Sequence, residues 1–377
     1  MAYDEFETQL GELNERGRFR ELRARAGIDF TSNDYLGLAE SAELRQAAIE
    51  AIARGVPVGA GGSRLLRGNH AEHEALEVEA ARHFGAESAL YFGAGYTANH
   101  AIFSTLPQRG DIVLYDALVH ASVHEGLHHC RAPHEAVAHN DAGAFDTKLT
   151  QWRKAGGRGR PWIAIESVYS MDGDNADLAE FIAVADRHDA TLVIDEAHAT
   201  GVLGVDGRGL AAAFEGRDNV ITLHTCGKAL GTSGGFVLAP GIVRDFLVNR
   251  ARPFIFATAP SPLIAAVTRA SLSISRTQPE RRERLAHLVA FAAGELKTRC
   301  GLNASPSHIL PIIIGPDDRA VAVAAALQAQ GFDVRAIRPP TVPEGTARLR
   351  IALTAKLNED IISELFDATA QALRQQS

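Results

Sequence analysis

The chain has 377 residues, of which 46% are hydrophobic and 22% charged, so it carries more apolar material than the core of one ordinary domain needs. A formal net charge of -8, with scattered Lys and Arg, excludes a basic surface for nucleic acid or an anionic membrane. The three cysteines form no CxxC pair, which excludes a readable disulfide framework or cysteine zinc site. The acidic N-terminus is unlike a signal peptide, and no apolar run is long enough to cross a bilayer. We therefore expect a cytoplasmic protein of two lobes.

The predicted elements begin with a helical arm over residues 4–25, where Phe6, Leu10 and Leu13 share one face, followed by a short strand at Ile28. From about residue 70 to 260, apolar runs alternate with segments of helical period, which predicts a mostly parallel sheet covered by helices. The predicted strands are 88–92, 111–115, 162–166, 191–195, 219–224 and 235–239. Strands at 309–314 and 348–353, with a helix at 318–330 and a final helix, predict a smaller α+β lobe.

This pattern predicts an α/β fold in three parts. We expect an N-terminal helical arm and strand over residues 1–45, a large domain over 46–275 and a small C-terminal domain over 276–377. The clearest local unit is 162–195, where a helical stripe lies between two strands as in a right-handed βαβ crossover. We expect the two lobes to share a cleft.

The segment Asp195-Glu-Ala-His198 follows a predicted buried strand, and parallel sheets present ligand groups at the carboxyl ends of their strands. An aspartate that caps a turn and a structural histidine would give the same letters. Lys228 lies 33 residues further on, just after the next predicted strand and in a glycine-rich turn. A lone Gly-Lys is more often a surface loop, but a lysine buried here can act as nucleophile and base.

Two further segments accompany the lysine and the aspartate. The stretch around Gly95 and Tyr96 passes from a strand through glycines into a helix, whose free backbone N-H groups can hold a phosphate. His120 and His124 have a spacing that a metal site could use, but no third ligand is evident and we predict no metal. A lysine nucleophile, a carboxylate for a pyridinium nitrogen, a phosphate cradle and an aromatic stacking partner together predict pyridoxal 5'-phosphate (PLP) as the cofactor.

The motifs also carry a family resemblance along the whole chain. The chain resembles the α-oxoamine synthase family of fold-type I PLP-dependent transferases. The motifs are Ser32-Asn-Asp-Tyr-Leu-Gly-Leu, Gly59-Ala-Gly-Gly-Ser-Arg, His120-Ala-Ser, Tyr169-Ser-Met-Asp-Gly-Asp, Asp195-Glu-Ala-His and Thr225-Cys-Gly-Lys-Ala-Leu-Gly.

The resemblance implies a role for each matching residue. Lys228, His120, Asp195 and His198 are the implied catalytic residues: Lys228 bonds the cofactor, Asp195 pairs with the pyridine nitrogen, His198 bonds the phenolic oxygen and His120 stacks on the ring. The other implied contacts of the cofactor are Gly95, Tyr96 and Thr225 at the phosphate, Glu166 and Ser170 beside it, and Thr258 from the neighbouring subunit of a homodimer.

The implied substrate contacts are Asn33 and Arg350 for the amino-acid carboxylate and Arg23 for the acyl chain. Arg348 lies two residues from Arg350 on the same strand face, so spacing does not separate the two arginines, although we prefer Arg350. Arg67 carries an extra positive charge, either for a phosphorylated carrier or as a salt-bridged surface residue.

The stretch 337–350 resembles the family members of biotin biosynthesis, which condense L-alanine with a pimeloyl thioester in an acyltransferase reaction. The acyl carrier, coenzyme A or acyl carrier protein, stays open because both present the same phosphopantetheine arm. Glycine C-acetyltransferase, 5-aminolevulinate synthase and a serine-using synthase are the enzymatic alternatives, and a PLP-binding carrier or regulator is the alternative outside enzymes.

Overall fold

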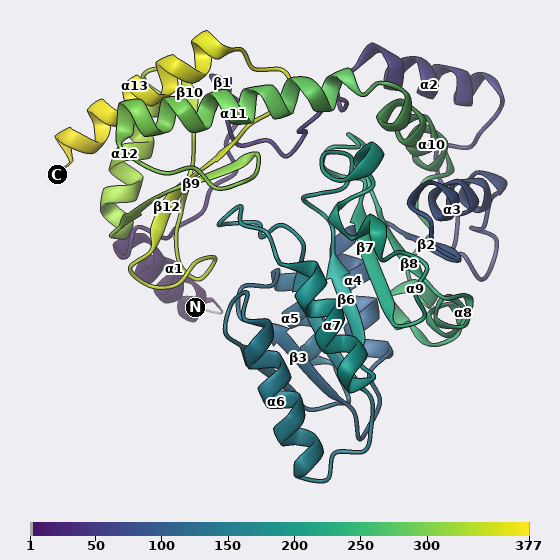
Figure 1. The fold of residues 1–377 in the computed structure, drawn as a ribbon. Coiled ribbons are helices and arrows are strands. Elements are labelled where there is room, and N and C mark those ends of the chain that lie inside the picture. The colour runs from purple at the N-terminus through teal and green to yellow at the C-terminus, as the bar shows by residue number, and fades with distance from the viewer. Residues whose placement is uncertain (1–2, 377) are drawn as a thin grey trace. The chain divides into compact units, whose positions relative to one another are not determined.

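The computed structural model describes residues 3–376, which form two compact units (Figure 1). The large unit comprises Leu36–Tyr169 and Asn175–Arg282, and the small unit comprises the chain up to Tyr35, Ser170–Asp174 and the chain from Glu283 onward. Residues 1, 2 and 377, the ends of the predicted terminal segments, lie outside the described residues.

A seven-stranded sheet forms the centre of the large unit, in the order β2-β8-β7-β6-β5-β3-β4. β8 runs antiparallel to both of its neighbours, whereas the other six described strands share one direction, which confirms the predicted mostly parallel sheet. The strands are β2 (Ser88–Phe92), β3 (Ile112–Asp116), β4 (His134–Val137), β5 (Pro161–Glu166), β6 (Thr191–Asp195), β7 (Val220–Thr225) and β8 (Gly235–Ala239).

Helices cover both faces of this sheet because residues along each central strand alternate between two buried clusters. In β5, Trp162 and Ala164 pack with α4, α5, α8 and α9, whereas Ile163 and Ile165 pack with α6 and α7. Near β2 and β8, the second face is covered by α3 and α10. The helices of the unit are α2 (Ala42–Ala53), α3 (Ala71–Phe84), α4 (Gly95–Thr105), α5 (Ala121–His128), α6 (Ala142–Lys154), α7 (Leu178–His188), α8 (Gly241–Arg250), α9 (Arg252–Ile255) and α10 (Pro262–Thr277), with two short 3-10 turns at Val205–Gly207 and Leu210–Ala213.

The predicted crossover helix is α7, whose apolar stripe is buried against the sheet. Asp177 caps its first turn by accepting from the backbone N-H groups of Ala179 and Glu180, and a left-handed residue, Asp189, ends it. These local signals place β6, and with it Asp195, directly after the helix.

The small unit contains a three-stranded antiparallel sheet, in the order β11-β12-β9, and a parallel pair of β1 and β10. Its strands are β1 (Ile28–Asp29), β9 (Ile309–Gly315), β10 (Phe332–Asp333), β11 (Ala336–Ile337) and β12 (Ala347–Ala352). Its helices are α1 (Asp4–Glu15), α12 (Asp317–Ala329) and α13 (Glu359–Gln375), while α11 (Glu280–Cys300) begins in the large unit and continues into the small one.

Two features of the chain ends differ from the sequence predictions. The arm helix stops at Glu15 instead of reaching residue 25, because Gly17 adopts a left-handed conformation that ends it. The segment predicted as a separate arm is divided between the units: β1 pairs with β10 of the small unit, whereas α2 packs on α10 of the large one.

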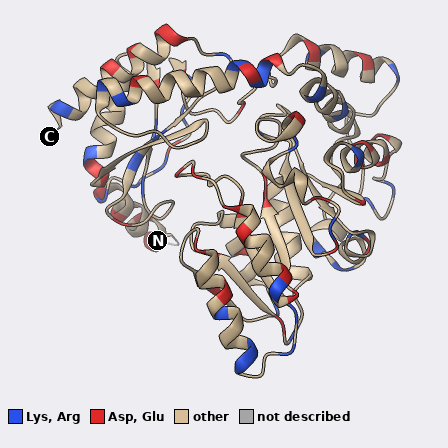
Figure 2. Cartoon of the chain, viewed as in Figure 1, with Lys and Arg blue, Asp and Glu red and all other residues tan. Residues whose placement is uncertain are grey.

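Acidic and basic residues are interspersed along the helices of each unit (Figure 2). Among residues 3–376, no helix is both long and apolar enough to cross a membrane. All three cysteines are free thiols.

Candidate active site

In the large unit, the segments that follow β6 and β7 bring a histidine and a lysine into contact. Lys228 Nζ lies 2.8 Å from His198 Nε2, across 30 residues of sequence. His198 is buried and Lys228 is half-buried, so both groups are largely withdrawn from bulk water. An amine in hydrogen-bond contact with an imidazole has a nearby group with which it can exchange a proton.

Asp195 ends β6 and is held by two donors. Its Oδ2 accepts from Asn99 Nδ2 at 2.7 Å, and its Oδ1 accepts from the backbone N-H of Ala197 at 2.9 Å. Asp195 is 6% exposed. The two donors therefore fix a carboxyl group at the end of a central strand, where it can face a ligand.

His120 occupies the position before α5 and is fixed through a serine. Its Nδ1 lies 2.8 Å from Ser122 Oγ, which in turn accepts from Asn99 Nδ2 at 2.9 Å. The ring of Tyr96 meets that of His120 edge to face, with centroids 6.4 Å apart. Burial lowers the pKa of His120, so its ring is neutral near pH 7 and suited to stacking on a flat ligand.

Glu166 is a second buried carboxyl group beside Asp195, opposite it in the register of β5 and β6. Burial, followed by the charge of Asp195, raises the pKa of Glu166 well above its usual range. Its Oε1 is buried without a hydrogen-bond partner among residues 3–376. The sequence resemblance placed Glu166 beside the cofactor, and the structure shows it opposite Asp195 on the neighbouring strand.

The start of α4 is shaped as an anion cradle. Gly95 opens the helix, and Ala94 before it provides no side-chain cap, so the first backbone N-H groups stay available. Thr225 Oγ1 would lie 3.4 Å from a Cβ at position 95, so its hydroxyl adjoins the same helix end. Gly235 must also be a glycine, because a Cβ there would approach Gly95 Cα to 2.9 Å.

These residues fit the chemistry of PLP. The helix start and Thr225 suit its phosphate, Asp195 suits its ring nitrogen, and Lys228 suits its aldehyde carbon. Two buried polar atoms of this region, Asn99 Oδ1 and Glu166 Oε1, have no partner among residues 3–376, as expected where a further polar group binds nearby. Thr258, predicted to serve the neighbouring subunit, is exposed in this chain.

The predicted carboxylate-binding residues lie in the small unit. Arg350 is 7% exposed, and its Nε donates to the backbone oxygen of Ser170 at 2.6 Å. Its Nη2 donates to Asn33 Oδ1 at 3.1 Å and to the hydroxyl of Tyr35 at 3.4 Å. All three acceptors are neutral, so the positive charge of Arg350 is held in place without being cancelled.

The structure separates the two arginines that spacing could not. Arg348 forms an ion pair with Asp172, so its charge is already balanced. No carboxylate of residues 3–376 pairs with Arg350. The geometry therefore favours Arg350 over Arg348 as the group for a substrate carboxylate. Arg23, the third predicted substrate residue, is exposed and pairs with Glu21 at 3.3 Å.

Sequence reasoning missed three residues: Asn99 and Ser122, near Asp195 and His120 in the large unit, and Tyr35, beside Arg350 in the small unit. All three are buried polar side chains in or beside motifs already singled out. The available signal for Asn99 was its place in the helix after Gly95, where a polar residue stands among small apolar ones. No signal in the sequence paired it with Asp195, which is 96 residues away.

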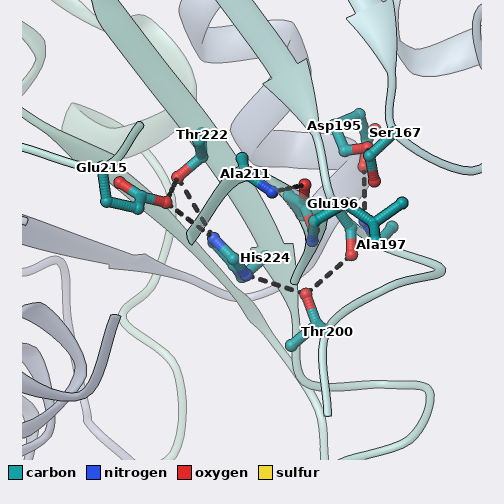
Figure 3. A network of polar contacts seen from close by, with 10 residues as sticks. Ser167, Asp195, Glu196, Ala197, Thr200, Ala211, Glu215, Thr222 and His224 are labelled. Atoms are coloured by element: carbon teal, nitrogen blue, oxygen red, sulfur yellow. Dashed lines mark hydrogen bonds and ion pairs between the residues drawn. The ribbon is translucent and has the colours of Figure 1, made fainter. Parts of the chain in front are cut away.

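A second polar network lies behind the site strands (Figure 3). His224, the residue before Thr225, contacts Thr200 Oγ1 at 2.8 Å and Glu215 Oε1 at 3.3 Å. Glu196, the residue after Asp195, accepts from the backbone N-H groups of Leu210 and Ala211, and burial raises its pKa to about 7.

Comparison with known proteins agrees with this geometry. The chain belongs to the aminotransferase class I and II family, whose sequence profile matches residues 25–368. Its fold is that of the fold-type I PLP-dependent transferases, as predicted. Serine palmitoyltransferase from S. paucimobilis, solved with a bound PLP-myriocin aldimine, matches with a TM-score of 0.90 and 28% identity over 100% of this chain and 98% of that one.

Similarity to curated sequences is more specific. The 8-amino-7-oxononanoate synthase of Chromobacterium violaceum is 41% identical over 97% of this chain and 98% of its own length. That of Marinobacter nauticus is 39% identical over 98% of this chain and 96% of its own. A solved 8-amino-7-oxononanoate synthase from Francisella tularensis matches with a TM-score of 0.77 and 26% identity over 93% of this chain and 98% of that one. The predicted resemblance to the α-oxoamine synthases is confirmed.

Proposed function

We propose that the chain is a PLP-dependent acyltransferase of biotin biosynthesis. It condenses L-alanine with a pimeloyl thioester, on coenzyme A or acyl carrier protein, and releases 8-amino-7-oxononanoate, CO2 and the free thiol. The observation that carries this assignment is the 41% identity with a relative named 8-amino-7-oxononanoate synthase over almost the whole of both chains. The site of Lys228, His198 and Asp195 supplies the chemistry that the assignment needs.

PLP, when bound, supplies an electron-withdrawing ring that accepts the electron pair left when a bond to the Cα atom of the amino acid breaks. The chain's own residues hold the ring for this purpose. Asp195 keeps a proton on the ring nitrogen, because an adjacent negative charge in a desolvated site favours the cationic ring. His120 covers the ring, while Gly95, Tyr96 and Thr225 bind the phosphate.

Lys228 would hold the cofactor through Nζ, and its amine would be free once the amino group of L-alanine takes its place. The freed amine takes the proton from Cα, and the His198 imidazole, 2.8 Å from Nζ, can relay protons to and from it. Arg350 and Asn33 hold the alanine carboxylate, which decides the bond at Cα that is aligned for breaking. The resulting nucleophilic carbon attacks the thioester carbonyl and the thiol leaves. Loss of CO2 and reprotonation complete the reaction.

We further propose that the enzyme is a cytoplasmic homodimer in which Thr258 of each chain binds the cofactor phosphate of its partner. The exposure of Thr258 supports this arrangement, because the hydroxyl is accessible to a second chain. Sedimentation of the holoenzyme should give twice the mass of the chain, and a monomer with full activity would contradict the shared site.

The substrate assignment is tested by a matrix of amino acids and acyl donors. Purified holoenzyme is mixed with L-alanine, glycine or L-serine and with pimeloyl-CoA, pimeloyl-acyl carrier protein, acetyl-CoA or palmitoyl-CoA, and thiol release and product mass are measured. L-Alanine with a pimeloyl donor should give the fastest thiol release and the mass of 8-amino-7-oxononanoate. Faster release with glycine and acetyl-CoA, or with L-serine and palmitoyl-CoA, would move the chain to another activity of the same family.

A further inference from the structure

One buried amide, that of Asn99, connects three elements of the site. Asn99 lies one turn into α4, after the phosphate cradle, and is 1% exposed. Its Nδ2 donates to Asp195 Oδ2 at 2.7 Å, after β6, and to Ser122 Oγ at 2.9 Å, in α5. Ser122 Oγ in turn lies 2.8 Å from His120 Nδ1. The groups for the cofactor's ring nitrogen and ring face thus depend on the same side chain.

The second observation concerns two neighbouring buried carboxyl groups in the large unit, those of Asp195 and Glu166. Asp195 and Glu166 are opposite one another on adjacent parallel strands, and they are 6% and 2% exposed. Two neighbouring buried carboxyl groups do not both ionise near neutral pH, because the second charge is repelled by the first and poorly hydrated. The hydrogen-bond donors around the pair decide which one carries the charge.

The donors are distributed unequally. Asp195 accepts from Asn99 Nδ2 and from the backbone N-H of Ala197, whereas Glu166 receives one backbone hydrogen bond, from His120, and its Oε1 has no partner among residues 3–376. The orientation of the amide agrees with an ionised Asp195, since a carboxylate only accepts hydrogen bonds and Asn99 turns its nitrogen toward it. The opposite atom, Asn99 Oδ1, is buried and left without a partner in residues 3–376. The nitrogen of the amide thus donates to both Asp195 and Ser122.

We propose that Asn99 is a positioning residue that places the buried negative charge of the site on Asp195 rather than on Glu166, and that holds His120 through Ser122. The proposal rests on the proposed function, since it gives the aspartate its role at the cofactor ring. Asn99 itself acts through Asp195 and Ser122 and touches neither the substrate nor the reacting atoms.

The expected consequence is a change in how the site titrates. The titratable groups that interact with the carboxyl pair include His120, Lys228, Asp116 and Tyr169. Without the amide, the charge is shared between Asp195 and Glu166, so the ring nitrogen loses part of its counter-charge. The visible spectrum of the bound cofactor should then respond to pH with a shifted midpoint.

The experiment compares Asn99→Leu with Asn99→Leu/Glu166→Gln in the holoenzyme. Leucine has a similarly branched side chain and no donor, and the added glutamine cannot take up the charge. Asn99→Leu should shift the pH midpoint of the cofactor spectrum and slow exchange of the alanine Cα proton at least tenfold. The double variant should recover a large part of both effects, because Asp195 is again the only carboxyl group that can ionise. Ser122→Ala removes only the hydrogen bonds that link Asn99 to His120. It should leave the pH midpoint of the cofactor spectrum near that of the unmodified protein.

Asn249→Leu is the matched control, since Asn249 also donates from a helix surface, to the backbone oxygen of Asp245, but is exposed. An unshifted midpoint in Asn99→Leu, or a double variant as impaired as the single one, would overturn the proposal and leave Asn99 a packing residue. If Asn99→Leu does not fold, the same comparison is made with Asn99→Ser. The spectral midpoint needs no acyl donor, so a wrong substrate assignment would leave this result standing.

Discussion

Replacement of Arg350 by lysine should weaken the binding of L-alanine without changing the binding of the acyl donor. Arg350 is 7% exposed, and its described partners are the backbone oxygen of Ser170, the side-chain oxygen of Asn33 and the hydroxyl of Tyr35. Burial raises the pKa of Tyr35 to about 12, so that hydroxyl stays neutral. A buried guanidinium with only neutral acceptors lacks a counter-charge, which a bound carboxylate would supply.

The magnitude follows from the donors that the guanidinium can offer. Nε is used by Ser170 and Nη2 by Asn33 and Tyr35, whereas no described residue accepts from Nη1, so the two N-H groups of Nη1 can donate to a carboxylate. Lysine keeps the charge and one of these two hydrogen bonds. Loss of one charge-assisted hydrogen bond costs about 1.5 to 3 kcal/mol, which corresponds to a rise in KM for L-alanine of roughly 10- to 150-fold.

The assay is steady-state thiol release. L-Alanine is varied at saturating pimeloyl-CoA, and then pimeloyl-CoA is varied at saturating L-alanine. Arg348→Lys is the matched control, because Arg348 lies on the same strand but is paired with Asp172. It should lower thermal stability more than it changes KM for L-alanine. An equal rise in KM from Arg348→Lys, or an unchanged KM in Arg350→Lys, would refute the assignment of the carboxylate to Arg350.

Three further outcomes are expected. Lys228→Ala should abolish turnover while the protein still folds and binds PLP non-covalently, and measurable Cα proton exchange from L-alanine in this variant would contradict its role as the base. Asp195→Asn should retain PLP but slow Cα proton exchange by about 10²-fold, because a neutral amide does not hold the ring cationic; a near-normal exchange rate would count against the ring-nitrogen contact. Glu196 has its pKa raised from 4.5 to about 7, so its contribution to stability is complete below about pH 4.5 and is lost as the pH rises through 7. This loss amounts to about 3 kcal/mol. The free energy of unfolding, measured with urea between pH 5 and 8, should therefore fall less steeply with pH in Glu196→Gln than in the unmodified protein.

Much of the large unit was predictable because its strands are buried on both faces. The apolar runs at 88–92, 191–195 and 235–239 coincide with β2, β6 and β8. β4 was missed, since three of its four residues are exposed and it has no apolar run. The direction of β8 was also beyond the sequence, because a run of buried residues is the same whether the strand is parallel or antiparallel to its neighbours.

In the candidate site, too, some residues were predictable from the local sequence and others were not. The positions of Lys228 and Asp195 follow from local signals, a strand end followed by a polar motif. The choice between Arg348 and Arg350 needed Asp172, which is 176 residues from Arg348 and balances its charge. The link from Asn99 to Asp195 likewise joins two elements that local sequence patterns treat separately. Long-range pairing of polar groups is the part of this site that periodicity and spacing do not encode.

The network behind the site explains why the strands that carry the catalytic groups keep their positions. Asp195 and Thr225 close β6 and β7, and their sequence neighbours Glu196 and His224 are fully buried (Figure 3). Thr200 joins the two strands, donating to the backbone oxygen of Glu196 at 2.7 Å and contacting His224 Nδ1 at 2.8 Å. Buried hydrogen bonds of this kind are costly to leave unmade, so a sideways shift of either strand would lose several at once. The spacing between Asp195 and the turn that carries Lys228 is therefore held by the buried hydrogen bonds of Glu196, Thr200 and His224.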